Sequence, residues 1–359
     1  MKKAVLQTLR QELGKKDLQI VKLLNERAAL SIEIGKLKEL EGREVYDPSQ
    51  ESKVYDRLRK TNEGPLSNNA MKNIFGEIIS SSRALQTPTT IAYLGPEASF
   101  SYLAAQSHFG KSGQYSPQST IPEVFDEVER GKVSLGVVPI ENSVEGFVKV
   151  TLDGLIATPL NIRAEIFLRI SHCLISACER MDKIKRVYSH PQALAQCQGW
   201  LRKNLPHCPV VGLDSTAGAA KRVLEDREGA AIGSRLAAAT HGLKVVAEGI
   251  EDNTSNTTRF FVIGKGKTMP TGRDKTSMLF GTPHVPGALY HALEPFAREH
   301  INLNRIESSP MKERMWEYLF FIDFAGHMEE ERARTCLEDM GRVTTFIKVL
   351  GSYARGDEV

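Results

Sequence analysis

Two long cationic side chains lie on one face of a helix predicted near the start of the chain. Arg27 and Lys38 are eleven positions apart, so at ~100° per residue they fall within ~20° of each other, on the same stripe as Ile20, Leu24 and Ile34. A buried charge is costly unless an anion compensates it. A single such cation would usually extend its head to water, but two on one apolar face indicate a site for an anionic ligand.

Polar residues on the next two predicted helices match these cations. Ser82 and Gln86, one turn apart, continue the apolar face of a helix expected over residues 66–86. Asp47 and Glu51 stand at the start of the helix before it. Together with the two cations, these four residues describe a polar pocket inside a helix bundle, positive enough to bind a carboxylated ligand.

Arg10 lies on the edge of the same stripe, about 25 Å of helix away from Arg27. It cannot reach the same ligand within its own chain. The apolar period continues for about 35 residues, and a helix of that length buries its stripe only against other helices. We therefore expect a homodimer or a higher homo-oligomer, in which Arg10 enters the pocket of a second copy.

Small polar side chains gather at the ends of predicted strands and helices in the middle of the chain. Each group alone would be an ordinary cap or turn, but open α/β sheets bind ligands at such ends. Arginine pairs well with carboxylates, so Arg259 is expected to bind the anion. The candidate residues are Asn142, Ser143, Ser189, Gln196, Thr216, Thr258 and Arg259.

The sequence carries no motif for a metal or a cofactor. It has no GxSxG or HExxH motif, its histidines lack metal-ligand spacing, and no GxGxxG follows the first predicted strand. The segment GKGKT at 264–268 lacks the earlier glycine of a phosphate loop. We expect neither metal nor cofactor, because hydroxyls, amides and one arginine suit a small anion and an unassisted elimination.

The composition is that of an ordinary globular chain of two or three domains. Its 359 residues are 41% hydrophobic and 25% charged, with 47 basic and 44 acidic side chains that give a net charge of +3. The basic residues form no run, so neither nucleic acid nor a membrane surface is expected as a partner. The five cysteines form no CxxC pair, which favours the cytoplasm and argues against a zinc site.

The order of predicted elements divides the chain into three domains. Residues 1–87 are expected to be all-helical, and 91–265 alternate short β-rich runs with helices, which is typical of an α/β domain. Residues 276–353 are expected to have the β-α-β-β-α-β order of a ferredoxin-like fold. Its elements are predicted at 276–281, 286–299, 303–307, 316–324, 329–340 and 345–350.

The helical region resembles the small all-helical chorismate mutases. The matching stretches are LRQEL around Arg10, LLNERAALSIEIGKLK, YDPSQE and EIISSSRALQ. The resemblance implies that the cations hold the two carboxylates of chorismate, that Lys38 and Gln86 bind the ether oxygen, and that Glu51 binds the ring hydroxyl together with a main-chain contact near Asp47. The family usually has arginine where this chain has Gln50. The reaction is a unimolecular rearrangement, so positioning and charge stabilisation are sufficient for it.

The middle region resembles prephenate dehydratase over the whole of residues 91–265. The segments VVPIENS, YSHPQ, DSTA and NTTRFFVIG carry this resemblance, which implies a two-lobed α/β fold like that of periplasmic binding proteins. It also implies that Thr258 assists departure of the ring hydroxyl while Asn142, Ser189 and Gln196 orient prephenate. Glu141 is an alternative proton donor if burial raises its pKa.

The last region resembles the ACT domain that binds an amino acid in the same enzymes. The segments PGALYHAL and IESSP carry the resemblance and imply a phenylalanine pocket between subunits. Its expected residues are Gly287, Ala288, Leu289, Glu307 and Ser308. Tyr290 replaces the usual valine and Ser309 the usual arginine, which would alter ligand selectivity. The alternative is a module that only dimerises.

These resemblances together imply a bifunctional enzyme that takes chorismate through prephenate to phenylpyruvate and is inhibited by phenylalanine. One alternative is a dehydratase whose helical domain serves only for dimerisation. Another is a non-catalytic sensor of small anions, because two-lobed binding proteins share the architecture of the middle domain.

Overall fold

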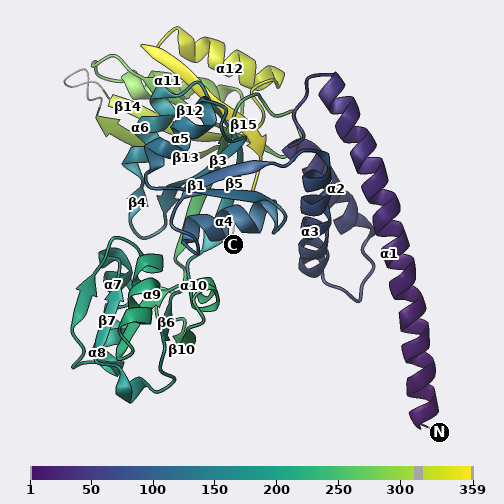
Figure 1. Ribbon diagram of the computed structural model, residues 1–359. Helices are drawn as coiled ribbons and strands as arrows, with labels where there is room; N and C mark the ends of the chain where they lie inside the picture. Colours follow the sequence, from purple (N-terminus) through teal and green to yellow (C-terminus); the bar gives the residue numbers. More distant parts are fainter. Residues whose placement is uncertain (1, 311–317, 357–359) are drawn as a thin grey trace. The chain divides into compact units, whose positions relative to one another are not determined.

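The computed structural model describes residues 2–310 and 318–356, which form two compact units (Figure 1). One unit holds most of the first 89 residues together with Phe109–Gln114. The other holds Pro48–Lys53, Thr90–His108 and the chain from Tyr115 onwards. Within the described ranges, no helix combines the length and the apolar character needed to cross a membrane.

Three helices make up the N-terminal part of the chain: α1 (Lys2–Leu40), α2 (Pro48–Thr61) and α3 (Asn68–Gln86). Ser67 caps α3, because its side chain accepts a hydrogen bond from the Ala70 amide at 3.1 Å. Helices α1 and α3 approach closely at Gly35, where an added Cβ would lie 2.7 Å from Cγ of Gln86. A residue without a side chain is therefore required at this contact.

Most of the apolar side chains of α1 are exposed. Leu9, Leu13, Leu23 and Ile34 have between 52% and 63% of their surface exposed. At ~1.5 Å per residue, a 39-residue helix is about 58 Å long. The contacts made with α3 at Gly35 and nearby residues cover only part of this length.

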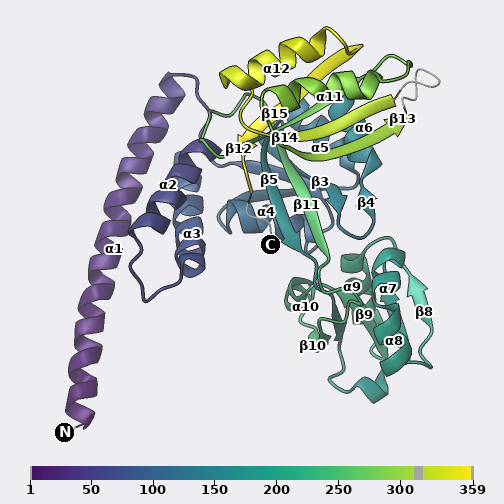
Figure 2. The ribbon, with the colours of Figure 1, turned by 180° about the vertical axis from the view of Figure 1, so that it is seen from behind.

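The α/β region contains two sheets, each with its own apolar core (Figures 1 and 2). The first sheet has the order β2-β1-β3-β11-β5, with β4 paired to β3, and the second has the order β10-β6-β9-β7-β8. The two sheets form two lobes, as predicted. The first lobe comprises β1 (Thr90–Leu94), α4 (Phe100–Phe109), β2 (Gln114–Gln118), α5 (Ile121–Glu129), β3 (Leu135–Asn142), β4 (Gly146–Phe147), α6 (Lys149–Ala157), β5 (Asn161–Arg169) and β11 (Thr257–Gly264).

The second lobe is inserted between β5 and β11. It comprises β6 (Cys173–Ser176), a 3-10 turn η1 (Met181–Lys183), β7 (Arg186–Ser189), α7 (Pro191–Gln196), α8 (Gln198–Asn204), β8 (Val210–Gly212), α9 (Thr216–Glu225), β9 (Gly229–Gly233), α10 (Arg235–Thr240) and β10 (Lys244–Glu248). The apolar runs of the sequence indicate strands of the α/β region at 91–94, 135–140, 186–189, 210–213, 230–233 and 259–264, so β2, β4, β5, β6 and β10 were not predicted. In β5 the reason is visible, because its buried Arg163 and Glu165 hide the apolar pattern of a strand.

The C-terminal module has the predicted β-α-β-β-α-β order. Its sheet is arranged β13-β14-β12-β15, and the two helices pack on one face of it through residues such as Phe296 and Met340. Its elements are β12 (Asp274–Gly281), α11 (Ala288–Arg298), β13 (Leu303–Pro310), β14 (Tyr318–Ala325), α12 (Glu331–Gly341) and β15 (Phe346–Ala354). The first two residues of the strand predicted over 316–324 lie outside the described residues.

The other face of this sheet packs against the first lobe. Leu279, Phe321 and Tyr353 of the module share one core with Phe261 and Ile263 of β11. Strand β15 runs so close to β5 that a Cβ at Gly351 would lie 2.3 Å from the carbonyl oxygen of Ile162. The C-terminal module is therefore joined to the α/β region by a continuous interior.

Candidate active sites

The first candidate site lies along the contact between α1 and α3. Arg27 Nη1 donates a hydrogen bond to Ser82 Oγ at 2.6 Å, and Ser82 Oγ donates to the Ile78 carbonyl at 2.7 Å. One turn further along α1, Gln86 Nε2 donates to Ser31 Oγ at 2.5 Å. The structure thus brings the predicted Arg27, Ser82 and Gln86 into one row. Ser31 was missed, although its position four residues after Arg27 is a signal that it shares the same face.

Lys38 lies at the end of this row. Its ammonium donates to the Val45 carbonyl at 3.1 Å and stands 3.9 Å from Asp47 Oδ2. Arg43 lies 3.8 Å from the same carboxylate oxygen. Both members of the Lys38–Asp47 pair keep less than a fifth of their side-chain surface exposed, so the cation is held beside the row rather than extended into solvent.

The remaining predicted residues of the helical region have simpler positions. Glu51 is half-buried in the first turn of α2, and Gln50 beside it is exposed. Arg10 is exposed on α1, about 25 Å from Arg27 along the helix axis. Arg10 therefore does not join the row of its own chain.

The second candidate site is centred on Thr258 at the start of β11. Thr258 and Asn142 are direct partners across β11 and β3, and Asn142 Nδ2 donates to Thr258 Oγ1 at 2.8 Å. The amide oxygen of Asn142 accepts hydrogen bonds from the backbone of Val144 and Glu145 at 3.0 and 3.2 Å. Because the Thr258 oxygen accepts from Asn142, its own proton is available for a ligand.

Further amides extend this cluster towards the second lobe. Asn142 Nδ2 also donates to Asn256 Oδ1 at 2.7 Å, and Asn256 Nδ2 donates to Gln196 Oε1 at 3.1 Å. Gln196 Nε2 in turn donates to Glu145 Oε1 at 3.1 Å. The predicted Asn142, Gln196 and Thr258 are therefore members of one network, in which Asn256 is the buried link.

His172 completes the network and was missed by the sequence analysis. Its Nε2 lies 2.9 Å from Gln196 Oε1, and an amide oxygen only accepts, so Nε2 carries the proton. Burial lowers the pKa of His172 below its ordinary value, although the hydrogen bond to Gln196 and the charge of Glu251 oppose the shift. Its Nδ1 is buried without a hydrogen-bond partner among the described residues, and its ring packs edge-on against Phe100 at 5.4 Å. A neutral imidazole thus fixes the orientation of the Gln196 amide.

Three other predicted residues lie near this cluster but make different contacts. Ser189 is fully buried and donates to the Ile232 carbonyl at 2.8 Å. Ser143 is exposed and accepts from the Thr257 amide at 3.0 Å. Thr216 is the first residue of α9, after the capping Ser215. None of the three is hydrogen-bonded to the Thr258 network among the contacts described.

Arg259 is not brought to the Thr258 cluster. Successive side chains of a strand point to opposite faces of the sheet, and the Arg259 guanidinium bonds Glu165 at 2.7 Å, Asp323 at 2.5 Å and the Tyr353 hydroxyl at 3.0 Å. Burial alone would lower the pKa of Arg259, but its interactions with Tyr353, Asp323 and Glu165 outweigh burial and raise it. Arg259, which was expected to bind a substrate carboxylate, is therefore bound to protein groups on the other face of the sheet.

Glu141 shares this opposite face. Its carboxylate is paired with Arg305 of β13, and it lies across from Arg259 in the register of β3 and β11. A cavity of about 470 Å³ opens here between the first lobe and the C-terminal module, lined by both residues and by Ser143. The geometry consequently favours Thr258 over Glu141 as the hydrogen-bond donor at the cluster.

The two predicted effector segments lie at one end of the C-terminal module. Strands β12 and β13 are both antiparallel to β14, so the segment after β12 and the end of β13 share that end. Gly287 precedes α11 with a φ of +79°, a conformation that favours glycine. Of the other predicted residues, Ala288 is buried, Leu289 and Glu307 are half-buried, and Ser308 is exposed.

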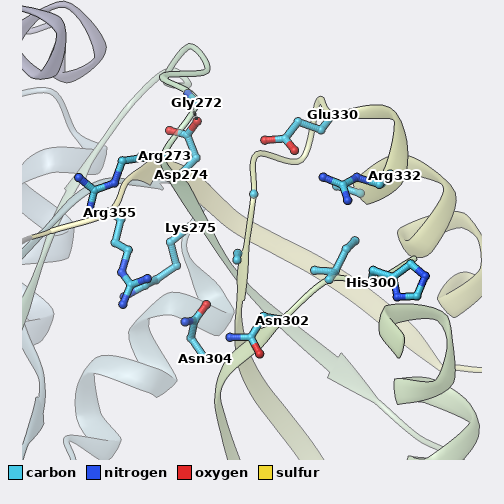
Figure 3. Close-up of a pocket in the computed structure, with 14 residues that line it drawn as sticks. Gly272, Arg273, Asp274, Lys275, His300, Asn302, Asn304, Glu330, Arg332 and Arg355 are labelled. Atoms are coloured by element: carbon cyan, nitrogen blue, oxygen red, sulfur yellow. Dashed lines mark hydrogen bonds between the residues drawn. The ribbon is translucent and has the colours of Figure 1, made fainter. Parts of the chain in front are cut away.

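A second cavity, of about 330 Å³, lies at the opposite end of the same module (Figure 3). Arg273 and Arg355 stand on one side of it, with Lys275 below them. Lys275 is buried and bonds Glu165 of the first lobe at 2.8 Å. This cavity therefore borders the interface with the first lobe and is separate from the effector segments.

Comparison with known families accounts for nearly the whole chain. The family model "Chorismate mutase type II" matches residues 9–87, "Prephenate dehydratase" matches 91–268, and "ACT domain" matches 276–342. These matches confirm the three resemblances and the fold classes predicted from the sequence.

Relatives align over the full length. The bifunctional chorismate mutase/prephenate dehydratase of Aquifex aeolicus is 44% identical over 354 residues, with 98% of each chain covered. The protein of that name from Escherichia coli K12 is 32% identical, with 96% of this chain and 95% of the relative covered. The crystal structure of prephenate dehydratase from Arthrobacter aurescens in complex with L-Phe matches with a TM-score of 0.70 at 37% identity, covering 76% of this chain and 92% of that one. The chain therefore belongs to the family of bifunctional chorismate mutase/prephenate dehydratases.

Proposed function

We propose that this enzyme rearranges chorismate to prephenate in its helical domain and then converts prephenate to phenylpyruvate in its two-lobed domain, with feedback by phenylalanine at the C-terminal module. Relatives of both activities match over the whole length of the chain. The observation that supports the second activity is the hydrogen bond from Asn142 to the Thr258 oxygen, which leaves the Thr258 hydroxyl proton available for the substrate. We assign the activities to residues 1–87 and 91–265, and the regulation to residues 276–353.

The mutase reaction needs a folded substrate and stabilisation of charge on its ether oxygen. Arg27 and Lys38 offer positive charge for the carboxylates and the oxygen, and Gln86 offers an amide donor. Ser82 holds the Arg27 guanidinium by a 2.6 Å hydrogen bond. Following the family pattern, Glu51 and the main chain near Asp47 bind the ring hydroxyl. No bond to the protein forms, so these groups act by positioning and by electrostatic stabilisation.

Arg10 enters this site from a second copy of the chain in the proposed homodimer. The support is the exposed apolar face of α1, which includes Leu9 and Leu13 on either side of Arg10. A monomer rarely leaves such a contiguous face in water. A second copy of α1 would cover it and would bring Arg10 of one chain towards Arg27 of the other.

In the dehydratase reaction, the C–C bond to the ring carboxylate breaks and its electron pair enters the ring. The C–O bond to the hydroxyl breaks in the same process, so carbon dioxide and hydroxide leave, and hydroxide is protonated to water. The Thr258 hydroxyl donates a hydrogen bond to the departing oxygen, while Asn142, Ser189 and Gln196 orient prephenate, with Ser143 and Thr216 at the edges of its site. Burial of the amide cluster strengthens these hydrogen bonds, and the gain of aromaticity drives the step.

Feedback is assigned to phenylalanine binding at Gly287, Ala288, Leu289, Glu307 and Ser308. The Arthrobacter relative, named as a complex with L-Phe, supports this assignment. Tyr290 and Ser309 stand where the family usually has valine and arginine, so we expect a different selectivity among aromatic amino acids. The five free cysteines agree with a cytoplasmic enzyme.

The decisive experiment measures phenylpyruvate formation from prephenate by the wild type and by Thr258→Ala. We expect the substitution to lower kcat by about 10²–10³-fold, the usual cost of one stabilising donor. Loss of chorismate, followed in the same preparations, should be unchanged, and the thermal unfolding midpoint of each preparation controls for folding of the α/β region. A wild type that forms no phenylpyruvate would favour the non-catalytic sensor, and one that does not consume chorismate would favour a helical domain that only dimerises.

A further inference from the structure

Two ion pairs connect the C-terminal module to the strands that carry the dehydratase site. Arg259 Nη1 of β11 lies 2.5 Å from Asp323 Oδ2 of β14. Arg305 of β13 is paired with Glu141 of β3. The side chains of Arg259 and Asp323 are at most 5% exposed and that of Glu141 is 9% exposed, so both pairs have at least one buried partner.

Strand register joins these two pairs into a ring of four charges. Arg259 lies directly across from Glu141 between β11 and β3. Arg305 lies directly across from Asp323 between β13 and β14. Positive and negative residues therefore alternate around the ring Glu141–Arg259–Asp323–Arg305, in which two sides are ion pairs and the other two are cross-strand register partners.

Other buried groups fix one side of the ring. Glu165 bonds Arg259 at 2.7 Å and also Lys275 of the C-terminal module at 2.8 Å. The Ser277 hydroxyl donates to the second carboxylate oxygen of Asp323 at 2.5 Å. Arg259 and Asp323 are thus held rigidly, whereas Arg305, with a 41% exposed side chain, is the accessible member of the ring.

The ring and the dehydratase cluster lie on opposite faces of β3 and β11, at adjacent positions of each strand. Glu141 precedes Asn142 on β3, and Arg259 follows Thr258 on β11. The Asn142–Thr258 hydrogen bond of 2.8 Å therefore depends on the backbone positions of the same stretch of β3 and β11 whose other face carries the ring. A displacement of β13 or β14 that pulls on the ring must move this stretch.

Strand β13 also carries two of the predicted effector residues, Glu307 and Ser308. Glu307 is two residues beyond Arg305, which places both on the same face of the strand, and Ser308 follows. A ligand bound at the end of β13 is thus only two or three residues from the cation that holds Glu141.

We propose that Arg305 and Asp323 are positioning residues for the dehydratase site, acting through Glu141 and Arg259, and that this ring is the route by which the C-terminal module controls Asn142 and Thr258. The inference rests on the proposed function of the two domains. It identifies residues outside the substrate site that set its geometry.

The first test compares Arg305→Met with Arg342→Met. Both substitutions remove one cation from the C-terminal module. The Arg342 side chain, however, is 76% exposed and is paired only with Asp339 in the contacts described. We expect Arg305→Met to lower dehydratase kcat about 10-fold with little change in KM, because the transition-state geometry is disturbed and the substrate contacts remain. Arg342→Met should match the wild type.

The same variants test the regulatory route. In Arg305→Met, the phenylalanine concentration that halves dehydratase activity should rise at least 10-fold, while phenylalanine binding measured by calorimetry changes less than 3-fold. Arg305→Lys keeps the charge and should recover most of both properties. Glu141→Gln should reproduce the Arg305→Met effects, and the double variant should be no worse than either single one, since both break the same pair.

The outcomes separate this proposal from the proposed function. A wild type without phenylpyruvate formation would contradict the proposed function itself. An active wild type with an Arg305→Met variant of equal kcat and equal phenylalanine sensitivity would overturn the ring. A Glu141→Gln loss far larger than that of Arg305→Met would also overturn it, because Glu141 would then act on the substrate. Circular dichroism and the thermal unfolding midpoint of each preparation report folding, and if Arg305→Met fails that control, Arg305→Lys and Glu141→Gln decide the question.

Discussion

The candidate site in the helical unit is held by charged side chains, whereas the one in the α/β region consists mainly of neutral amides and a hydroxyl, with the Glu145 carboxylate bonded to Gln196. In the first, Arg27 bonds Ser82 across the contact between α1 and α3, and Lys38 lies beside Asp47. In the second, Thr258 is held by Asn142 and Asn256 in a buried cluster. Two sites of one chain, with related substrates, thus use different groups.

The difference follows from what each proposed reaction does with charge. The rearrangement keeps both carboxylates and develops negative charge on an oxygen, so cations stabilise its transition state. The dehydration expels one carboxylate as carbon dioxide, and a cation bound tightly to that group would stabilise it against departure. Neutral donors avoid this penalty. The turning of Arg259 away from Thr258 fits the same logic.

The largest expected effect is that of Lys38→Ala on the mutase. Removing a cation from the developing charge should lower the rate of chorismate loss by about 10²–10³-fold, while dehydratase activity on added prephenate stays the same. Lys36→Ala is the matched control, because Lys36 is an exposed lysine two residues away on α1. If both variants lose the same small fraction of activity, the charged row between α1 and α3 is not the mutase site.

A smaller effect is expected from His172, the one ionisable ring of the neutral site. His172→Leu removes the donor to Gln196 Oε1 and should lower dehydratase kcat/KM about 10-fold, since a positioning contact and not the Thr258 donor is lost. His172→Gln retains an amide donor near the position of Nε2 and should lose only about 3-fold. Equal losses in the two variants would show that ring packing on Phe100, rather than the hydrogen bond, is what matters.

The same residue predicts a pH dependence of stability. The pKa of His172 is lowered in the folded protein, so the unfolded chain takes up the proton first as pH falls. The stabilisation from the neutral ring is complete above the ordinary pKa of ~6.5 and is lost as pH falls through the lowered value. The free energy of unfolding in urea should therefore fall more steeply with acidification for the wild type than for His172→Leu. Parallel curves would mean that His172 titrates normally.

The comparison also shows what sequence reasoning reached and what it missed. The faces that carry Arg27 on α1 and Ser82 and Gln86 on α3 were predictable because helical periodicity is local. Their meeting in one row joins residues 55 positions apart and was inferred from their matching polar character. The positions of Asn142 and Thr258 at strand ends came from the pattern of apolar runs, and their roles came from the family resemblance. His172 gave no local signal, because its contact with Gln196 joins residues 24 positions apart.

Arg259 was expected to bind the substrate anion, and its guanidinium contacts the protein carboxylates Glu165 and Asp323. Adjacent residues of a strand face opposite sides, so Thr258 and Arg259 of one strand do not both point into one cluster. What no pattern revealed is where Arg259 goes instead. Its partners Glu165 and Asp323 are 94 and 64 residues away. Glu165 lies on β5, a strand that the sequence did not reveal because its charged residues are buried in long-range pairs.

The smallest expected effect concerns Gln50, where the chorismate mutase family usually has arginine. Gln50 is exposed in the first turn of α2, next to Glu51. An added cation at an exposed position, where water screens its charge, contributes about 0.3–1 kcal/mol to binding. Gln50→Arg should therefore raise mutase kcat/KM about 2–5-fold by lowering KM. Gln50→Lys supplies the charge without the planar fork and should give a smaller gain. Because chorismate, the proposed substrate of the helical site, carries two carboxylates and this site has few cations, it is the site where one more charge should help. The dehydratase site, built on neutral donors in another part of the chain, should not respond. A gain in both activities would indicate a general effect on folding, and a loss of mutase activity would show that Gln50 itself contacts the substrate.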